Sequence, residues 1–418
     1  MHDPAFQTQQ WQERRGRWLV LTAAFLGWMF DGLEQGVFPL VARPALQDLL
    51  GVVGDKQIGP WMGYITALFL LGAALGGVVF GWLGDRVGRV RAMILSILAY
   101  SIFTGCCYFA QAPWQLGFFR FLSAIGMGGE WALGVALVME CWPEQHRPLL
   151  AGAIGAAANI GFGLLGFLGT MFQVTRDSWR WVMLAGAAPA LLTLFIALYV
   201  PESEKWKKSV QKKGAFPIRE IFSRGLRKTT LLGILFASVA LIGTWGSVQW
   251  LPAWADQLTE GKSHNAKGLT QMLTALGAVV GCFVGPLIGG RLGRRPAYFL
   301  LCLSSLFACG VLFRGVTHYG AFFLIMVTLV GGTTAAFYGW LPLYLPELFP
   351  TRVRATGQGL CYNSGRVLAA IGAIQMGYLM QFYGGSYARA GATITLIYIA
   401  GCVLIWIAPE TKGKPLPD

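Results

Sequence analysis

The chain has 418 residues, of which 55% are hydrophobic and only 12% are charged. A soluble globular protein carries about 25% charged residues, so this composition excludes that class and indicates a polytopic membrane protein. The formal net charge of +14 makes the distribution of the basic residues along the chain the next question.

Apolar runs long enough to span a bilayer, about 17–25 residues each, follow one another through the sequence. They lie at 17–40, 60–83, 92–110, 114–139, 149–172, 179–200, 230–252, 270–290, 297–313, 320–344, 356–381 and 388–408. We therefore predict an all-α membrane protein with twelve transmembrane helices. An even number of spans places both termini on the same side of the membrane.

Most of the 33 Lys and Arg residues fall in loops on the side of the two termini, with the largest group in the central loop 202–228. Basic loops mark the cytoplasmic side, which predicts an N-in, C-in topology in the plasma (inner) membrane. The basic residues therefore orient the chain in the lipid bilayer, and no nucleic-acid partner is expected. The central loop is interpreted as a tether, although its basic residues could also bind anionic headgroups.

The first span holds two acids, Asp31 and Glu34, which share a helix face because they are three residues apart. Trp28 precedes Asp31 by the same spacing. A charge inside a bilayer costs about 2.5–3.5 kcal/mol on insertion scales, so such residues are functional candidates. Burial disfavours the charged form of a carboxylate, and a carboxylate in this setting can take up and release a proton. The alternatives are a structural hydrogen bond and, for Glu34, a side chain that reaches outward.

The fourth span holds Arg120 and Glu130. Arg120 lies near the outer end of the span, at a depth similar to that of Asp31, so we expect the two side chains to lie close together. Its role is then either in proton coupling or in a purely structural ion pair. Glu130 follows three glycines in Gly126-Met-Gly-Gly-Glu130, which is typical of tight helix packing. It is therefore either a protonation site or a packed, hydrogen-bonded group.

The second half of the chain supplies candidate substrate-binding residues. Arg366 lies within span 11, shortly after Asn363, and its counterpart in the first half is Asn159. A guanidinium offers a fork of donors that suits a carboxylate, either of a substrate or of an acid such as Glu347. Trp245 and Gln249 are expected to share a helix face in span 7, and with Tyr338 in span 10 they could form an apolar wall with polar tips. The alternative for each of them is packing in the core or in the interfacial belt. Trp254 is interpreted as part of the interfacial aromatic belt.

An internal repeat divides the chain. Glu140-Cys-Trp-Pro-Glu-Gln-His-Arg147 and Glu347-Leu-Phe-Pro-Thr-Arg-Val-Arg354 share the form E-x2-P-x3-R. Gly88-Arg89 likewise recurs as Gly293-Arg294, and Pro201-Glu202-Ser203 as Pro409-Glu410-Thr411. Two parallel repeats predict a six-helix bundle at 1–201, a linker loop at 202–228 and a second six-helix bundle at 229–418, with the substrate site between them.

The loop motifs resemble a known family. Gly81-Trp-Leu-Gly-Asp85-Arg86-Val-Gly88-Arg89 is similar to the signature of the major facilitator superfamily, and Pro346-Glu-Leu-Phe-Pro-Thr-Arg352 resembles its sugar-porter-like branches. Gly126-Met-Gly-Gly-Glu130-Trp131 is similar to the metabolite:proton symporters and sialic acid transporters. In the second half Gly290 replaces the aspartate of the signature, and the span-7 polar signature of sugar porters is missing.

The resemblance implies a central cavity lined by spans 1, 4, 7 and 10 and a charged gate on the cytoplasmic side. Asp85 is expected at the N-terminus of span 11. Arg86 or Arg89 is expected to pair with Glu140 and Glu202, and Arg291 or Arg294 with Glu347 and Glu410, with Arg354 beside that second group. The predicted gate consists of Asp85, Arg86, Arg89, Glu140, Arg147, Glu202, Arg291, Arg294, Glu347, Arg354 and Glu410.

These observations predict a secondary transporter, active as a monomer, that moves a small organic solute, expected to be an anion, by proton symport with alternating access. Proton coupling is assigned to Asp31, Glu34, Arg120 and Glu130, and substrate binding to Trp28, Asn159, Trp245, Gln249, Tyr338, Asn363 and Arg366. A facilitative or proton-coupled sugar transporter and a non-transporting sensor are the alternatives. No cofactor or metal is expected, because nucleotide-binding and metal-ligand spacings are missing, and the four histidines lie at ends or in loops, which argues against an enzyme.

Overall fold

The computed structural model describes residues 4–51, 55–171, 174–212, 217–259, 263, 265–384 and 386–417, and every regular element within these ranges is helical. The α-helices are α1 (Pro4–Leu50), α2 (Asp55–Val87), α3 (Arg89–Cys106), α4 (Pro113–Cys141), α5 (Arg147–Met171), α6 (Trp179–Ala185), α7 (Ala190–Tyr199), α8 (Glu204–Lys212), α9 (Pro217–Ile221), α10 (Arg227–Gly246), α11 (Leu251–Leu258), α12 (Ala266–Leu292), α13 (Arg294–Gly315), α14 (Ala321–Leu348), α15 (Arg354–Phe382), α16 (Tyr387–Ile394) and α17 (Ile397–Leu404).

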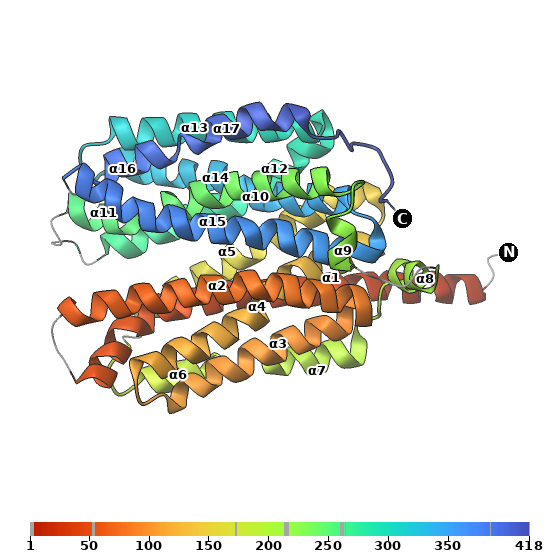
Figure 1. Ribbon diagram of the computed structural model, residues 1–418, viewed down its shortest axis with the longest axis horizontal. Helices are drawn as coiled ribbons and strands as arrows, with labels where there is room; N and C mark the ends of the chain where they lie inside the picture. The colour runs from red at the N-terminus through yellow and green to blue at the C-terminus, as the bar shows by residue number, and fades with distance from the viewer. Residues whose placement is uncertain are drawn as a thin grey trace.

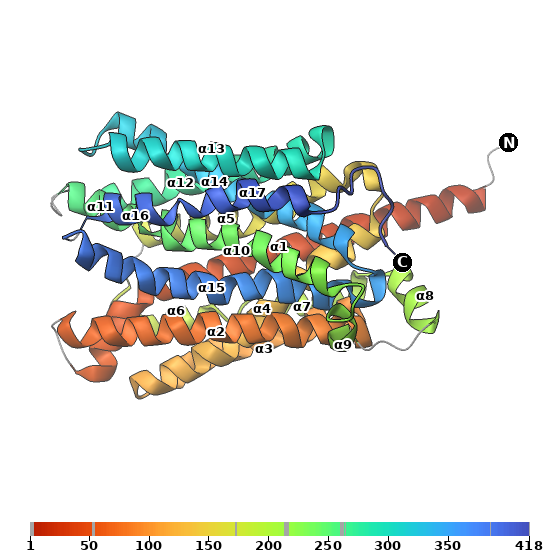
Figure 2. The ribbon, with the colours of Figure 1, turned by 45° about the horizontal axis from the view of Figure 1, so that its top comes forward.

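The long helices run along one axis of the molecule (Figure 1). Helices α2, α3, α4, α6 and α7 lie on one side, and α10 to α17 lie on the other. Both chain termini lie at the same end, together with the short helices α8 and α9; we call this end the terminal end. The first half of the chain, α1 to α7, contacts the second half, α10 to α17, mainly through α2 against α15 and α5 against α12. Figure 2 shows α2 and α15 side by side in a second view.

Ten stretches of the described helices are long and apolar enough to cross a membrane. Helices α1 and α15 are not among the ten, although the sequence predicts spans within both of them. These are the two helices that carry Asp31 with Glu34, and Arg366. The count of twelve spans therefore stays a prediction.

Close packing within each half depends on glycines at matching positions. A Cβ atom on Gly76 of α2 would lie 1.9 Å from the carbonyl oxygen of Ile125 of α4. A Cβ atom on Gly281 of α12 would lie 1.9 Å from the carbonyl oxygen of Gly332 of α14. Only glycine permits such contact between helix backbones, and small residues are typical of helix interfaces in membranes.

The turns between α2 and α3 and between α12 and α13 each depend on one glycine in the left-handed region. Gly88 has φ 113° and Gly293 has φ 107°, where side chains with a Cβ are strained. The two turns are equivalent positions of the sequence repeat. Each allows the following helix to begin directly at an arginine, Arg89 or Arg294.

Three predicted spans are interrupted in the structure. The run 179–200 consists of α6 and α7, separated by a turn from Gly186 to Pro189, where proline lacks an N–H and ends the hydrogen-bond ladder. The run 388–408 divides into α16, α17 and a terminal 3₁₀ turn. Helix α10 ends at Gly246, and the chain continues as a 3₁₀ turn at Val248–Trp250 and then α11.

Candidate functional site

A buried ion pair joins α1 to α4. Arg120 donates to Glu34, and both side chains are at most 2% exposed. Glu34 also accepts a hydrogen bond from Thr104 of α3 at 2.9 Å and one from Ser123 at 3.3 Å. The guanidinium lies over the rings of Phe69 and Phe38, 4.5 and 5.3 Å from their centroids. Buried charges persist when they are paired and hydrogen-bonded, and this pair meets both conditions.

This geometry corrects two expectations from the sequence. Arg120 was expected beside Asp31, but it binds Glu34, one helical turn further along α1. Glu34 does not reach outward, since only 3% of it is exposed. The two acids share a face, so depth counting alone does not separate two positions that differ by three residues, about 4.5 Å along the helix.

Asp31 and Glu130 are buried without hydrogen-bond partners among the described residues. They are 0% and 2% exposed, and none of their four carboxylate oxygens has a partner. The charges that act on Asp31 come from Glu130, Arg366 and Glu34. Glu130 packs against α1 one turn before Asp31, because a Cβ atom on Gly27 would lie 2.0 Å from Glu130 Oε1. Two buried carboxyl groups without hydrogen-bond partners among the described residues and one guanidinium form a cluster inside the molecule.

Three aromatic rings form a wall beside this cluster. Trp131 of α4 and Tyr362 of α15 stack with centroids 4.2 Å apart and an interplanar angle of 17°. Trp28 of α1 meets them at centroid distances of 6.5 and 6.4 Å. The guanidinium of Arg366 lies 5.0 Å from the Tyr362 centroid. The wall therefore combines flat apolar faces with one cation, a combination that suits a planar or unsaturated anion.

Arg366 is held by its neighbour Asn363. Its Nη1 donates to Asn363 Oδ1 at 3.0 Å, and Asn363 Nδ2 donates to the carbonyl oxygens of Gly359 at 2.9 Å and Gly128 at 3.2 Å. Arg366 does not pair with Glu347, one of the partners considered from the sequence, because Glu347 is bound elsewhere. Asn363 thus connects Arg366 to α4 of the opposite half.

The remaining predicted substrate residues are dispersed. Asn159 donates to the Gly155 carbonyl at 3.3 Å and to Cys282 Sγ at 3.7 Å, at the contact between α5 and α12. Tyr338 lies near Tyr362 and Arg366, and its hydroxyl bonds Thr244.

Two aromatic expectations were wrong. Trp245 and Gln249 do not share a helix face, because α10 ends between them, and Gln249 is exposed. Trp254 does not belong to an interfacial belt; it is 3% exposed and packs against Phe323 and Phe313, with centroids 5.4 and 5.5 Å away.

At the terminal end a charged cluster joins the two halves. Arg89 donates to Asp85 at 2.6 Å, to Glu140 at 3.0 Å and to the carbonyl of Thr351 at 2.6 Å. Asp85 accepts from the backbone N–H of Thr356 at 2.8 Å, in the first turn of α15. An anion at that position is favoured by the unpaired amides and the helix dipole.

The equivalent cluster of the second half has different partners. Arg294 donates twice to Glu347, at 2.9 and 2.6 Å. Arg354 was expected here, but it crosses to the first cluster and donates to Glu140 at 3.0 Å. Arg147, the repeat counterpart of Arg354, forms an ion pair with Glu144 of its own half at 3.3 Å. Among the described residues, the crossing of Arg354 to Glu140 therefore has no counterpart in the ion pairs of the second cluster.

Four predicted gate residues take other roles. Glu202 and Glu410 bind the backbone instead of the side chains of the arginines expected beside them: Glu202 accepts from the backbone N–H of Arg89 at 3.1 Å, and Glu410 accepts from that of Arg294 at 2.9 Å. Arg86 is exposed and lies over the Trp82 ring. The side chain of Arg291 is also exposed, and its carbonyl accepts from Lys412.

Sequence reasoning missed the polar residues that complete these clusters. Thr104 and Ser123 bind Glu34, Ser203 donates to Glu140, and Thr411 donates to Glu347 at 2.6 Å. Ser203 and Thr411 occupy equivalent positions in the repeat, directly after Glu202 and Glu410, and that match was the available signal. Single hydroxyl residues such as Thr104 carry no comparable pattern.

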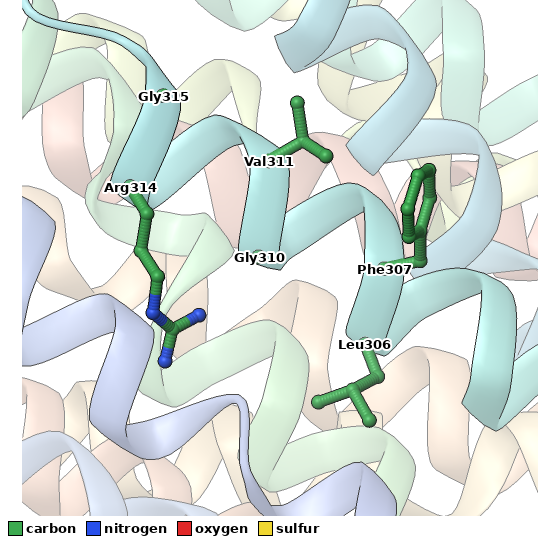
Figure 3. Close-up of a pocket in the computed structure, with 6 residues that line it drawn as sticks. All are labelled: Leu306, Phe307, Gly310, Val311, Arg314 and Gly315. Carbon is green, nitrogen blue, oxygen red and sulfur yellow. The ribbon is translucent and has the colours of Figure 1, made fainter.

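A separate depression of about 540 Å³ lies along α13 (Figure 3). It is lined by Leu306, Phe307, Gly310, Val311, Arg314 and Gly315. All six residues come from one helix, and Phe307 and Arg314 are exposed. The depression lacks the converging polar groups of a substrate site. No cluster of three potential metal-ligating side chains occurs in the part of the chain that the structure describes.

Comparison with known proteins identifies the family. The model of the Major Facilitator Superfamily matches residues 18–373. The inner membrane metabolite transport protein YgcS of Escherichia coli is 29% identical, covering 88% of this chain and 89% of the relative. The cis,cis-muconate transport protein of Acinetobacter baylyi is 27% identical, covering 84% of this chain and 86% of the relative.

A solved structure of the proton:xylose symporter XylE has the same fold, with a TM-score of 0.78 over 96% of this chain and 97% of that chain at 17% identity. The resemblance seen in the loop motifs is thereby confirmed. The chain is a multi-pass membrane transporter and belongs to the Major Facilitator Superfamily.

Proposed function

We propose that this protein moves a small organic anion across the membrane together with protons, by alternating access. The observation that carries the proposal is the buried cluster of Asp31, Glu130 and Arg366, in which two carboxylates lack hydrogen-bond partners among the described residues. An uncompensated charge in the membrane is costly, so a proton shared between the two acids neutralises the empty cluster. Glu34 and Arg120, being mutually paired, hold α1 against α4 and complete the proton-coupling group.

Arg366 is the proposed binding group for the substrate carboxylate, with Trp28, Trp131 and Tyr362 as the wall for its carbon skeleton. Support comes from the stacked geometry beside the guanidinium. The muconate transporter among the relatives gives independent support for an anion, since muconate is an unsaturated dicarboxylate. Asn159 of the first half and Tyr338 of the second half remain in the proposal as substrate-binding residues.

The transport cycle proposed here uses two six-helix bundles, 1–201 and 229–418, joined by the linker 202–228. The twelve-span, N-in, C-in topology places the terminal end in the cytoplasm, and the inner membrane location of one relative agrees with this. The charged clusters around Asp85 and Glu347 act as the gate that is closed at this end. The protein functions as a monomer within the lipid bilayer, since each chain has its own site.

The test uses purified protein in proteoliposomes loaded with a pH-sensitive dye. Addition of cis,cis-muconate outside is expected to acidify the interior, and Asp31→Asn is expected to abolish the acidification. Asp177→Asn is the matched control, because Asp177 is an exposed acid in the loop before α6. Tracer uptake without acidification, unchanged in Asp31→Asn, would contradict proton coupling and leave a facilitator. Xylose, added in parallel, tests the sugar alternative.

A further inference from the structure

Asn363 occupies a notch formed by the opposite half of the molecule. It is 0% exposed and lies on α15, but its Nδ2 donates to the carbonyl oxygen of Gly128 on α4. A Cβ atom on Gly77 of α2 would lie 1.8 Å from the same Nδ2. The amide therefore enters the first half between α2 and α4, and only a glycine at position 77 leaves room for it.

Arg366 determines which way this amide points. The oxygen and nitrogen of an asparagine side chain are nearly equal in shape, so its orientation follows from its partners. A guanidinium has donors only, and Arg366 Nη1 therefore requires the oxygen of Asn363 at 3.0 Å. That arrangement directs the NH₂ group toward the Gly128 carbonyl, the partner in the other half.

We propose that Asn363 is a positioning residue that links occupation of Arg366 to separation of the two halves. The inference rests on the proposed function, in which Arg366 binds the substrate carboxylate. A carboxylate that engages the guanidinium in the bidentate manner withdraws Nη1 from Asn363. The amide then loses its orienting donor, the bond to Gly128 weakens, and α15 is released from α4 while substrate is bound.

The guanidinium of Arg366 binds either Asn363 or the substrate carboxylate, so substrate binding acts on the contact between the halves. Without substrate, Arg366, Asn363 and Gly128 form a continuous chain of hydrogen bonds from the site to the contact between the halves. With substrate, the same guanidinium is occupied, and the contact is weaker. A single neutral hydrogen bond shifts an equilibrium by about fivefold. The expected effect on the closed-to-open ratio at the terminal end is therefore about fivefold.

Hydrogen-exchange mass spectrometry of the full-length protein tests this relay, and no probe has to be attached to the chain. In the wild type, cis,cis-muconate is expected to raise exchange in the segments 81–91 and 351–360, where the two halves meet at the terminal end. In Asn363→Ala these segments should exchange about fivefold faster without muconate, and muconate should add no further increase. Ser364→Ala, on the same turn of α15, is the matched control.

Two further variants separate a relay from a merely structural role. Gly77→Ala displaces the amide from the side of α2 and should reproduce the exchange pattern of Asn363→Ala. Asn363→Asp keeps an acceptor for Arg366 but adds a charge that competes with the substrate, so its affinity for muconate should fall below that of Asn363→Ala. Thermal melting of each variant verifies that it is folded.

The outcomes distinguish the relay from the function on which it rests. If Arg366→Gln binds muconate as tightly as the wild type, the assignment of Arg366 fails, and the relay fails with it. If Arg366→Gln loses binding but Asn363→Ala still responds to muconate as the wild type does, only the relay is overturned. Loss of the response in both Asn363→Ala and Gly77→Ala, with binding retained, supports it.

Discussion

The side chains of Glu34 and Asp31 are one turn apart on α1, yet they have opposite environments. Glu34 has Arg120, Thr104 and Ser123 as partners, whereas the oxygens of Asp31 have none among the described residues. The sequence predicts that both acids matter, because acids in an apolar run are costly. It does not predict which acid is paired, since that depends on the rotation and depth of α4 relative to α1 within a few ångströms.

At this scale the ion pair gives a stability prediction. Arg120→Leu leaves Glu34 buried without its cation and is expected to lower the free energy of unfolding by about 3–5 kcal/mol. The double variant Glu34→Gln with Arg120→Leu should recover most of that loss, because no charge remains unpaired. Unfolding in mixed micelles measures the free energy of unfolding of the single variant and of the double variant. Equal losses in the single and double variants would contradict the assignment of a mutually compensating pair.

At the scale of elements, two glutamates cap helices that are distant in the sequence. Glu202 accepts from the backbone N–H groups of Arg89 and Val90 at the start of α3, and Glu410 does the same at the start of α13. The sequence repeat predicts that the two glutamates are equivalent. The repeat does not reveal that their partners are backbone N–H groups, because every residue except proline carries such a group and no residue type marks it.

Glu410 predicts a pH-dependent contribution to stability. Burial raises the pKa of Glu410, but the backbone N–H groups of Arg294, Arg295, Lys412 and Thr411 lower it more, so the pKa lies below its ordinary value. The stabilisation is therefore present above the ordinary pKa of about 4.3 and is lost as the pH falls through the lowered value.

Glu410→Gln should lower the stability at pH 7 by about 1 kcal/mol, the usual effect of losing a helix cap. The difference from the wild type should shrink as the pH falls below about 4. Thermal melting at a series of pH values measures this difference in stability, with Glu204→Gln as the control because Glu204 is exposed. A difference that stays constant down to acidic pH would argue against capping by the charged form.

Contacts between whole helices lead to another prediction. A Cβ atom on Gly359 of α15 would lie 2.3 Å from the carbonyl oxygen of Gly77 on α2, across the contact between the halves. Gly359→Ala should separate the halves at the terminal end and raise hydrogen exchange in 81–91. Gly76→Ala, which disturbs α2 against α4 within one half, is the control and should lower the melting temperature instead. If Gly359→Ala and Gly76→Ala had identical effects, the contact of Gly359 between the halves would not differ in role from the contact of Gly76 within one half.

At the scale of the molecule, the two charged clusters are not equivalent. Asp85 and Glu140 bind groups of α15 and Arg354 from the other half, whereas Arg294 and Glu347 both belong to the second half. The repeat predicts the residues of both clusters. The repeat does not predict that Arg354 crosses to Glu140, because sequence similarity between halves does not say which half an arginine side chain enters.

This asymmetry predicts separate consequences for the two clusters. Arg354→Gln should open the terminal end, increasing hydrogen exchange in 81–91 and 351–360 while leaving each half folded. Arg294→Gln should instead reduce the thermal stability of the second half, because it leaves Glu347 buried without its cation. Hydrogen-exchange profiles of the two variants over the whole chain test whether the clusters have separate roles. Indistinguishable profiles would mean that both clusters act between the halves.

The stack of Trp131 on Tyr362 joins α4 to α15, and so it spans the boundary that the proposed alternating access would open. An indole in van der Waals contact with a phenol has a different emission from one facing water or a ligand. The protein therefore carries an intrinsic optical reporter at the seam between its halves. Subtracting the spectrum of Trp131→Phe isolates that signal from the other fifteen tryptophans among the 16 in the chain, so the rate of opening becomes readable in native protein by stopped-flow fluorescence.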